Sequence, residues 1–359
     1  MGIDIKNMPA PIKAFFNGIA QVVFIENVIS GMMIFVTFWL ANLECLNWDF
    51  SNWNSWKLVV FVAIGVNLAN LVAYLIGADH DAIKSGLFGF CPTLICVGCV
   101  TFFAGAASVP DQSAWELTEW IVMGLGCALC PMLQVVINRF TGHFGLPGFT
   151  FPFIVTSWFF VLISFHTGLI ESVKESALNA PVAVDAATSW YNGFDFSTLN
   201  WDLGSGSSWL MIWLNGFEEI YVCDGVIASI VLIAAYFWYN WQFALKACLA
   251  CAISVGMAFL FGASMGNMGW ALYSYSAILT AGALDTFGKS KKNSGRYWFL
   301  WFYGVILTCL VNYAIDGVFG IFGLPNCTFA FVLSGWMMLV VEHFMIEQFD
   351  KKKGIKAAE

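Results

Sequence analysis

Hydrophobic residues run through the chain in long blocks that short polar segments interrupt. A helix that crosses a bilayer needs about 20 mostly apolar residues, and ten blocks reach or approach that length. The blocks cover residues 25–42, 57–77, 92–108, 117–137, 150–169, 222–240, 243–262, 276–287, 297–320 and 327–346. The pattern therefore predicts an all-α integral membrane protein.

Four shorter segments accompany these blocks. Residues 10–22 and 208–220 are amphipathic and precede the first and sixth blocks, while residues 81–91 and 266–276 are rich in glycine and too short to span. Helices that enter a bilayer without crossing it are tolerated where protein or a water-filled cavity covers their backbone. We therefore expect two re-entrant half-helices, near 81–91 and near 266–276.

Composition agrees with a lipid environment. Hydrophobic residues make up 60% of the 359-residue chain and charged residues 11%, with a mean hydropathy of +0.77, whereas soluble domains carry about 25% charged residues. The lipid bilayer is therefore an expected partner. No basic patch with interleaved aromatic residues occurs, so nucleic acid is not expected as a partner.

The basic residues predict an orientation. If the N-terminus is cytoplasmic and the chain crosses ten times, every Lys and Arg except Lys57 and Lys174 lies on the inner side, out of 15 in total. This asymmetry is typical of cytoplasmic loops. The acidic connection 170–208 then lies outside, and both termini are cytoplasmic in a cell membrane, either plasma or bacterial inner.

The sequence contains an internal repeat. Residues 145–153 (GLPGFTFPF) and 323–331 (GLPNCTFAF) match at six of nine positions, with an offset of 178 that also relates Trp158 to Trp336. Each half holds five blocks, so the second half enters the membrane in the opposite sense. Inverted repeats of this kind build transporters with the substrate site near the midplane. The repeat makes a central pore at the junction of the halves the expected site.

Four regions follow from this organisation. They are a first repeat at 1–169, an extracellular linker at 170–208, a second repeat at 209–346 and a basic cytoplasmic tail at 347–359.

Three elements of the repeat resemble those of the urea transporter family. The LPxxTxPF signature is present at 146–153, and a second copy at 324–331 has Ala330 in place of the second proline. The family's Gly-x-x-Gln-Val element with a following aromatic residue matches 18–24. Its Gly-Leu-aromatic-Gly-aromatic element matches 86–90. Second copies of these two elements begin at Gly216 and Leu272, so the resemblance extends over nearly the whole chain.

The resemblance implies a fold and an activity. The fold would be two inverted repeats of five transmembrane helices each, with two re-entrant half-helices around a central pore. The activity would be passive, channel-like urea transport in a homotrimer, with a pore in each subunit and no cofactor. Cys91 and Ser276 stand where the family typically has Asn, which keeps open a channel of the same fold for a short amide, ammonia or water.

Urea is planar and uncharged, and an unsatisfied polar group in hydrocarbon costs several kcal/mol. A pore must therefore offer hydrogen bonds weak enough for release. Thr150 and Thr328 are candidate midplane ligands, Gln21 and Glu219 candidate acceptors near the mouths, and aromatic and leucine side chains candidate walls and constrictions. The full set of candidate pore residues is Gln21, Phe24, Phe90, Leu94, Thr150, Glu219, Ile220, Tyr275, Leu279 and Thr328.

Catalysis and metal binding are less favoured by the residues. An intramembrane hydrolase that uses Glu219, Glu218 or the histidines is the remote alternative, but HExxH does not occur. The one GxSxG match, GASMG at 262–266, follows an apolar helical block and not the strand that this motif requires. Three cysteine pairs have the CxxC spacing, at 96–99, 127–130 and 248–251. Cysteine also packs as a small apolar residue inside helices. We therefore predict that the chain is not an enzyme and has no metal site.

Overall fold

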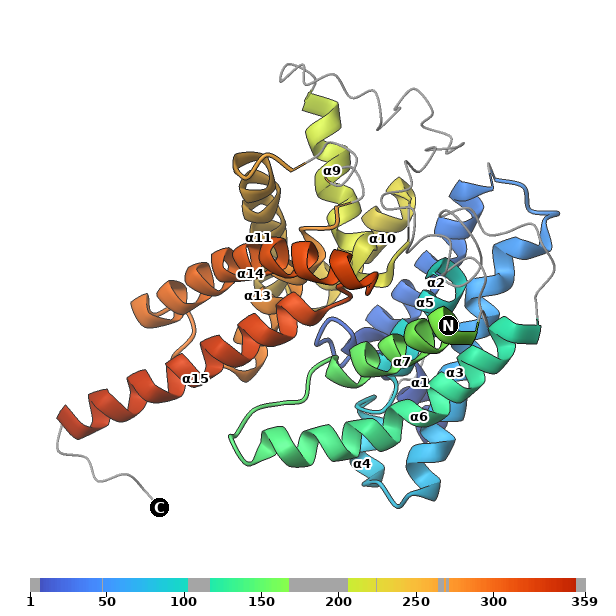
Figure 1. The fold of residues 1–359 in the computed structure, drawn as a ribbon, viewed down its shortest axis with the longest axis horizontal. Coiled ribbons are helices and arrows are strands. Elements are labelled where there is room, and N and C mark those ends of the chain that lie inside the picture. Colours follow the sequence, from blue (N-terminus) through green and yellow to red (C-terminus); the bar gives the residue numbers. More distant parts are fainter. Residues whose placement is uncertain are drawn as a thin grey trace.

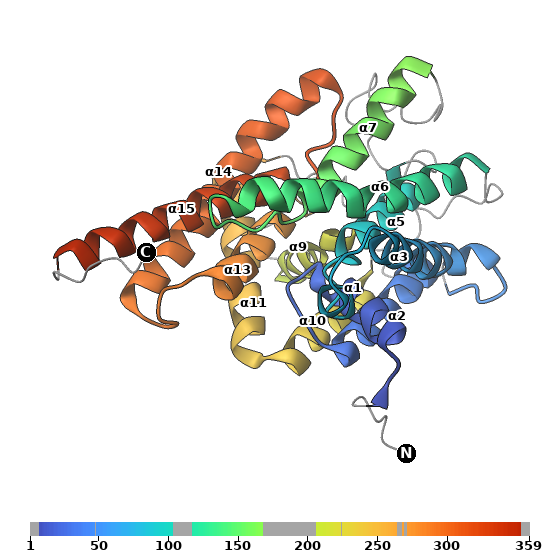
Figure 2. The same cartoon turned by 90° about the horizontal axis from the view of Figure 1, so that it is seen from below.

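The computed structural model describes residues 7–46, 48–102, 117–167, 206–223, 225–263, 268 and 271–352. Over these residues the protein consists of helices and connecting turns, without strands. Helices of the first half (blue to green) and of the second half (yellow to red) lie on different sides of the molecule in both views (Figures 1 and 2). The predicted all-α class is confirmed.

The helices follow the apolar blocks. In the first half they are α1 (Ala10–Gln21), α2 (Val28–Cys45), the 3₁₀-helix η2 (Trp53–Trp56), α3 (Lys57–Leu75), α4 (His80–Lys84), α5 (Phe90–Phe102), α6 (Leu117–Gly142) and α7 (Phe151–Thr167). In the second half they are α9 (Gly206–Glu218), the 3₁₀-helix η3 (Glu219–Tyr221), α10 (Val226–Tyr239), α11 (Trp241–Leu260), α13 (Tyr275–Phe287), α14 (Gly295–Phe322) and α15 (Phe329–Lys352).

Several helices have the length and composition of membrane spans. In the described part of the chain five qualify: Trp53–Leu75, Leu117–Gly142, Trp241–Leu260, Gly295–Phe322 and Phe329–Phe349. A sixth is added if Trp209–Tyr221 and Val226–Tyr239, which meet at a 74° bend, form one broken span. The remaining apolar helices are shorter, so the count of five full spans in each repeat stays a prediction.

Two short helices lie close to the predicted half-helices. In the segment 81–91, residues 81–84 belong to α4, residues 85–89 form a turn in which Gly86 has a φ of +89°, and α5 begins at Phe90. A Cβ added at Gly89 would lie 2.7 Å from the Cα of Gly18, so α1 and this turn touch through their backbones. The short helices α5 and α13 begin at Phe90 and Tyr275, near the C-terminal ends of the two Gly-rich segments, so the placement of the half-helices stays a prediction. The described part of each has 13 residues, about 20 Å at 1.5 Å per residue.

The predicted linker and tail fall largely outside the described residues. The linker 170–208 lies within the undescribed range 168–205, except for the first residues of α9. The helix α15 continues to Lys352, past the predicted end of the second repeat at 346.

The two halves hold each other through paired helices. The helix α2 packs against α10, and α7 packs against α15. The Ser30 hydroxyl donates to the Ala235 carbonyl at 3.0 Å. The buried carboxylate of Glu44 accepts from the backbone N–H of Ile227 at 2.9 Å, where α10 begins. An acceptor at a helix N-terminus satisfies one of its free N–H groups. Glu44 therefore has two roles: it joins the halves and it caps α10.

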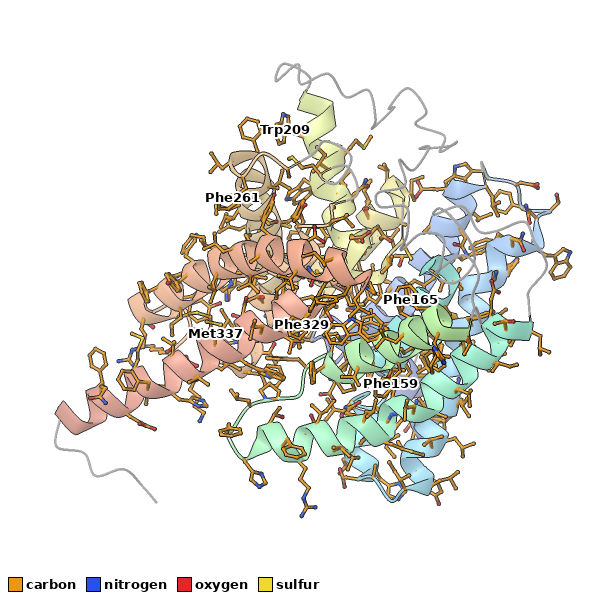
Figure 3. The ribbon with its side chains drawn as sticks, in the orientation of Figure 1. Phe159, Phe165, Trp209, Phe261, Phe329 and Met337 are labelled. Carbon is orange, nitrogen blue, oxygen red and sulfur yellow. The ribbon has the colours of Figure 1, made fainter. Side chains whose placement is uncertain are left out.

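The outer faces of the helices are apolar. Figure 3 shows large side chains projecting outward, and Phe159, Phe261 and Met337 are 46%, 48% and 45% exposed. Soluble monomers rarely expose large contiguous apolar surfaces. This exterior suits contact with lipid chains.

Candidate functional site

Two threonines meet at the junction of the repeat signatures. The hydroxyl oxygens of Thr150 and Thr328 lie 2.6 Å apart, and both residues are buried. Each threonine directly precedes a helix, α7 or α15, so the two LPxxT turns bring them together from positions 178 residues apart. The sequence prediction that these two residues share one place is consistent with this geometry.

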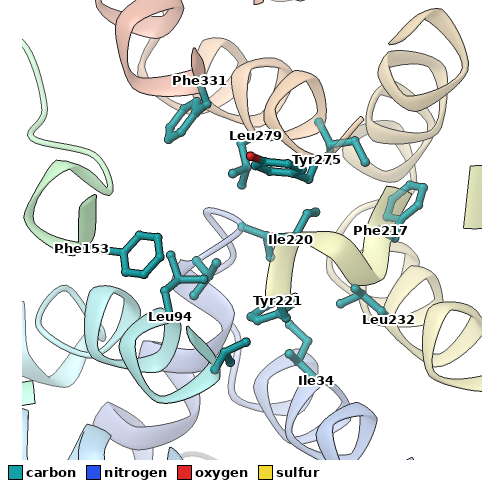
Figure 4. Close-up of a cluster of buried hydrophobic side chains, with 14 of the residues drawn as sticks. Ile34, Leu94, Phe153, Phe217, Ile220, Tyr221, Leu232, Tyr275, Leu279 and Phe331 are labelled. Carbon is teal, nitrogen blue, oxygen red and sulfur yellow. The ribbon is translucent and has the colours of Figure 1, made fainter. Parts of the chain in front are cut away.

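Beside this pair lies a cavity of about 180 Å³. One water needs roughly 10–15 Å³ of such volume, so the cavity has room for a small solute. Both halves contribute to its wall: Leu94, Phe153, Glu219, Ile220, Val222, Leu272, Tyr275, Asp316, Pro325, Asn326, Cys327 and Thr328. Figure 4 shows the buried apolar side chains of this region, with Leu94 and Phe153 from the first half facing Ile220 and Tyr275 from the second.

The polar part of the cavity wall includes two acidic residues and an asparagine. Glu219 and Asp316 contribute carboxyl groups, and Asn326 contributes a carboxamide. The Tyr275 hydroxyl, in contrast, already donates to the Cys327 carbonyl. A chamber with such acceptors and apolar walls suits a small solute that carries several N–H donors.

Half of the ten candidate pore residues line this cavity, namely Leu94, Glu219, Ile220, Tyr275 and Thr328. Thr150 adjoins it through its bond to Thr328. Gln21 instead donates to the Ser85 carbonyl at 3.1 Å, Leu279 is buried, and Phe90 is packed against the core. The structure thus brings four of the five second-half candidates and Leu94 to one cavity, and leaves Gln21, Phe24, Phe90 and Leu279 outside its wall.

Phe24 belongs to a different group of side chains. It forms a four-phenylalanine cluster with Phe149, Phe287 and Phe331, with ring centroids 6.1, 5.8 and 5.8 Å from that of Phe24. Phe149 and Phe331 are themselves 4.8 Å apart. None of the four lines the cavity, and Phe149 directly precedes Thr150 in the chain. The cluster is therefore a group of packed aromatic rings next to the threonine pair.

Four residues around the site have left-handed backbone conformations. The φ angles are +62° at Phe24 and +49° at Val222, which match in the repeat, and +49° at Phe149 and +47° at Cys327, which also match. Residues other than glycine rarely adopt this region, and each instance costs on the order of 1–3 kcal/mol. Such strain clusters at functional sites. Nothing in the sequence marks these four positions, because none is glycine.

Seven residues of the cavity wall were not among the predicted pore residues: Phe153, Val222, Leu272, Asp316, Pro325, Asn326 and Cys327. Asp316 carried a signal, since an acidic residue inside an apolar block defaults to a functional hypothesis. Asn326 carried a weaker one, because it differs from Gly148 at the matching position of the first copy.

The two positions that depart from the family pattern do not reach the cavity. Cys91 and Ser276 are both fully buried, and neither belongs to the cavity wall.

Where the structure describes them, the cysteine pairs do not assemble a metal site. The sulfur atoms of Cys96 and Cys127, from different CxxC pairs, lie 3.6 Å apart. Within the described ranges no group of three or more His, Cys, Asp or Glu residues has an arrangement that could hold a metal ion.

Long apolar helices around a partly polar inner cavity define a multi-pass membrane protein of the transporter or channel class. The chain belongs to the urea transporter family, whose sequence model matches residues 12–343. It is 24% identical over 324 residues to Urea transporter 1 of Ovis aries, which covers 90% of this chain and 75% of the relative. Urea transporter 1 of Mus musculus is 22% identical over the same shares. These findings confirm the resemblance that the three sequence elements carried.

Proposed function

We propose that the protein transports urea passively across a cell membrane, by a channel-like mechanism, through a path at the junction of two inverted repeats. Membership of the urea transporter family supports the solute. The observation that carries the mechanism is the Thr150–Thr328 contact beside a cavity whose wall includes residues from both halves.

The path combines binding with ready release. In the cavity, carboxyl and carboxamide oxygens accept hydrogen bonds from the N–H groups of urea. Leu94 and Ile220 form part of the apolar wall around it. At the next step the threonine hydroxyls exchange their mutual hydrogen bond for bonds to the solute. Each polar contact replaces part of the hydration that urea loses, and none requires a covalent step. Beyond the threonines, the four-phenylalanine cluster separates to pass a flat solute and excludes hydrated ions.

Repeat symmetry in the polar contacts supports the inverted-repeat architecture. In the first half, Gln134 donates to the Leu87 carbonyl. In the second half, Asn312 donates to the Leu272 carbonyl at 3.0 Å. Gln134 and Asn312 differ by the same 178 residues as the LPxxT copies. Each contact ties the longest helix of its half to the turn before a short helix, α5 or α13.

The buried ion pair of Lys57 supports the cytoplasmic placement of both termini. Lys57 is one of only two basic residues on the outer side in that orientation. It is fully buried and its ammonium lies 2.8 Å from the Glu119 carboxylate. Since its charge is neutralised within the protein, Lys57 does not weaken the basic asymmetry that sets the orientation.

We further infer a homotrimer with one pore in each subunit, on family membership alone.

The alternatives find less support. A channel for a different neutral solute rested on Cys91 and Ser276, and both lie away from the cavity wall. An intramembrane hydrolase conflicts with membership of a family of transporters.

Stopped-flow light scattering on proteoliposomes under an inward urea gradient tests the proposal. We expect fast, saturable urea entry, slowed by Thr150→Val and by Glu219→Leu. Thr156→Val is the matched control, because its hydroxyl donates to the Pro152 carbonyl of its own helix at 2.8 Å. Urea entry no faster than in empty liposomes, with protein insertion verified, would exclude urea as the solute.

A further inference from the structure

We propose that Asn326 is a specificity-determining residue of the solute path, and that its carboxamide oxygen accepts an N–H group of the solute at a subsite beside Thr328. The inference rests on the proposed urea transport and adds a residue to it. It starts from a chain of side-chain amides that ends at the cavity.

The Leu272 carbonyl, at the end of the amide network away from the cavity, sets the orientation of both amides. The Leu272 carbonyl can only accept a hydrogen bond, so Asn312 must turn its NH₂ group toward it, at 3.0 Å. The oxygen of Asn312 then faces Asn326, which must answer with its own NH₂ group, at 2.6 Å. The network therefore sets the orientation of both amides, as such networks do in proteins.

In this orientation one oxygen of the amide network has no hydrogen-bond donor in the described part of the chain. The Oδ1 atom of Asn326 is buried, and no donor in the described ranges reaches it. Asn326 also lines the cavity, two residues before Thr328. An unsatisfied buried acceptor is costly, and native structures rarely keep one without a reason. A solute N–H in the cavity supplies the missing donor, and Asn312 acts as the positioning residue that keeps the oxygen, not the NH₂ group, available.

The subsite belongs to one half only. At the matching position of the first half stands Gly148, which has no side chain, and its backbone N–H donates to the Asn138 oxygen at 3.1 Å. A Cβ at Gly148 would lie 2.3 Å from that oxygen, so no side chain fits there without a shift. The acceptor that Asn326 offers therefore has no counterpart across the junction. It favours solutes with a free NH₂ group, such as urea and short primary amides, over those whose nitrogen is fully methylated.

The test is the concentration dependence of solute entry into proteoliposomes containing the full chain. Asn326→Leu should raise the half-saturating urea concentration by roughly two- to tenfold, the range that one hydrogen bond supplies, and should reduce the preference for acetamide over N,N-dimethylacetamide. Asn312→Leu should give part of this effect. The double variant should match Asn326→Leu alone, because both changes remove the same oriented acceptor.

A structural role predicts a different result. It would lower the maximal rate through loss of folded protein and leave the half-saturating concentration unchanged, and the two substitutions would add. Asn67→Leu is the control, since Asn67 is exposed on α3 and donates to the Ala63 carbonyl away from the cavity. Unchanged half-saturation in Asn326→Leu, with wild-type protein active, overturns this inference alone. Absence of urea entry in the wild-type protein overturns the transport proposal and this inference together.

Discussion

The indole N–H of Trp158 donates to the backbone carbonyl of Pro325 at 2.9 Å, from one half of the chain to the other. The reverse contact is also made: Trp336 donates to the Pro147 carbonyl at 2.7 Å. Both tryptophans and both prolines are related by the 178-residue offset. Each LP turn, and with it the threonine three residues later, is thus held in place by the helix of the opposite half.

This reciprocity predicts equal costs for the two tryptophans. Trp158→Phe and Trp336→Phe should each lower the free energy of unfolding by about 1–2 kcal/mol, since each leaves a carbonyl without its donor. Chemical denaturation in mixed micelles measures the change. Trp238→Phe is the control, because Trp238 is 59% exposed on α10. A large loss for only one tryptophan would contradict a symmetric role.

The threonine pair gives a second prediction. Thr150→Val and Thr328→Val should each slow urea entry roughly two- to tenfold, because a passing urea molecule loses one hydrogen-bond partner at the junction. The double variant should lose less than the product of the two effects, since the hydroxyls bond to each other and act as a unit. Stopped-flow light scattering at matched protein density measures the rates. Independent, multiplicative effects would show that the threonines act at separate places.

The buried ion pair between α3 and α6 gives a third. Lys57 and Glu119 are 0% and 5% exposed at their side chains. Lys57→Met should destabilise the protein by about 3–5 kcal/mol, because it leaves a buried carboxylate without its cation. The double variant Lys57→Met/Glu119→Leu should recover most of this loss, since two apolar residues remove both desolvation costs. Thermal unfolding followed by size-exclusion chromatography tests both, and a double variant as weak as the single one would contradict this account.

Much of the fold could be predicted because membrane helices depend on local composition. A run such as 57–77 must be helical in lipid whatever its neighbours are, and α3 follows it closely. The exact ends of the short helices were harder to predict, because they depend on tertiary contact. In the turn before α5, Gly89 approaches Gly18 closely, and a single sequence does not reveal that approach.

The site was predictable to the extent that the repeat marked it. Thr150 and Thr328 were predicted to be site residues because two copies of one signature coincide, and inverted repeats place such copies at the junction. Phe149 and Phe331 were missed because the chain contains 35 phenylalanines, and neither composition nor spacing separates those of the cluster from lipid-facing ones. The role of Asn326 depends on an amide network that only the folded chain assembles.

The four-phenylalanine cluster gives the last prediction. Phe24 contacts all three other rings, so its flat side chain sets how closely they approach. Phe24→Leu keeps the site apolar but replaces the plane with a shorter branched chain. We therefore expect N-methylurea entry to rise relative to urea entry, because the cluster no longer favours the narrower solute. Phe237→Leu is the control, because Phe237 lies 43% exposed on α10. An unchanged ratio of the two solutes in Phe24→Leu, at equal urea flux, would assign the cluster to helix packing alone.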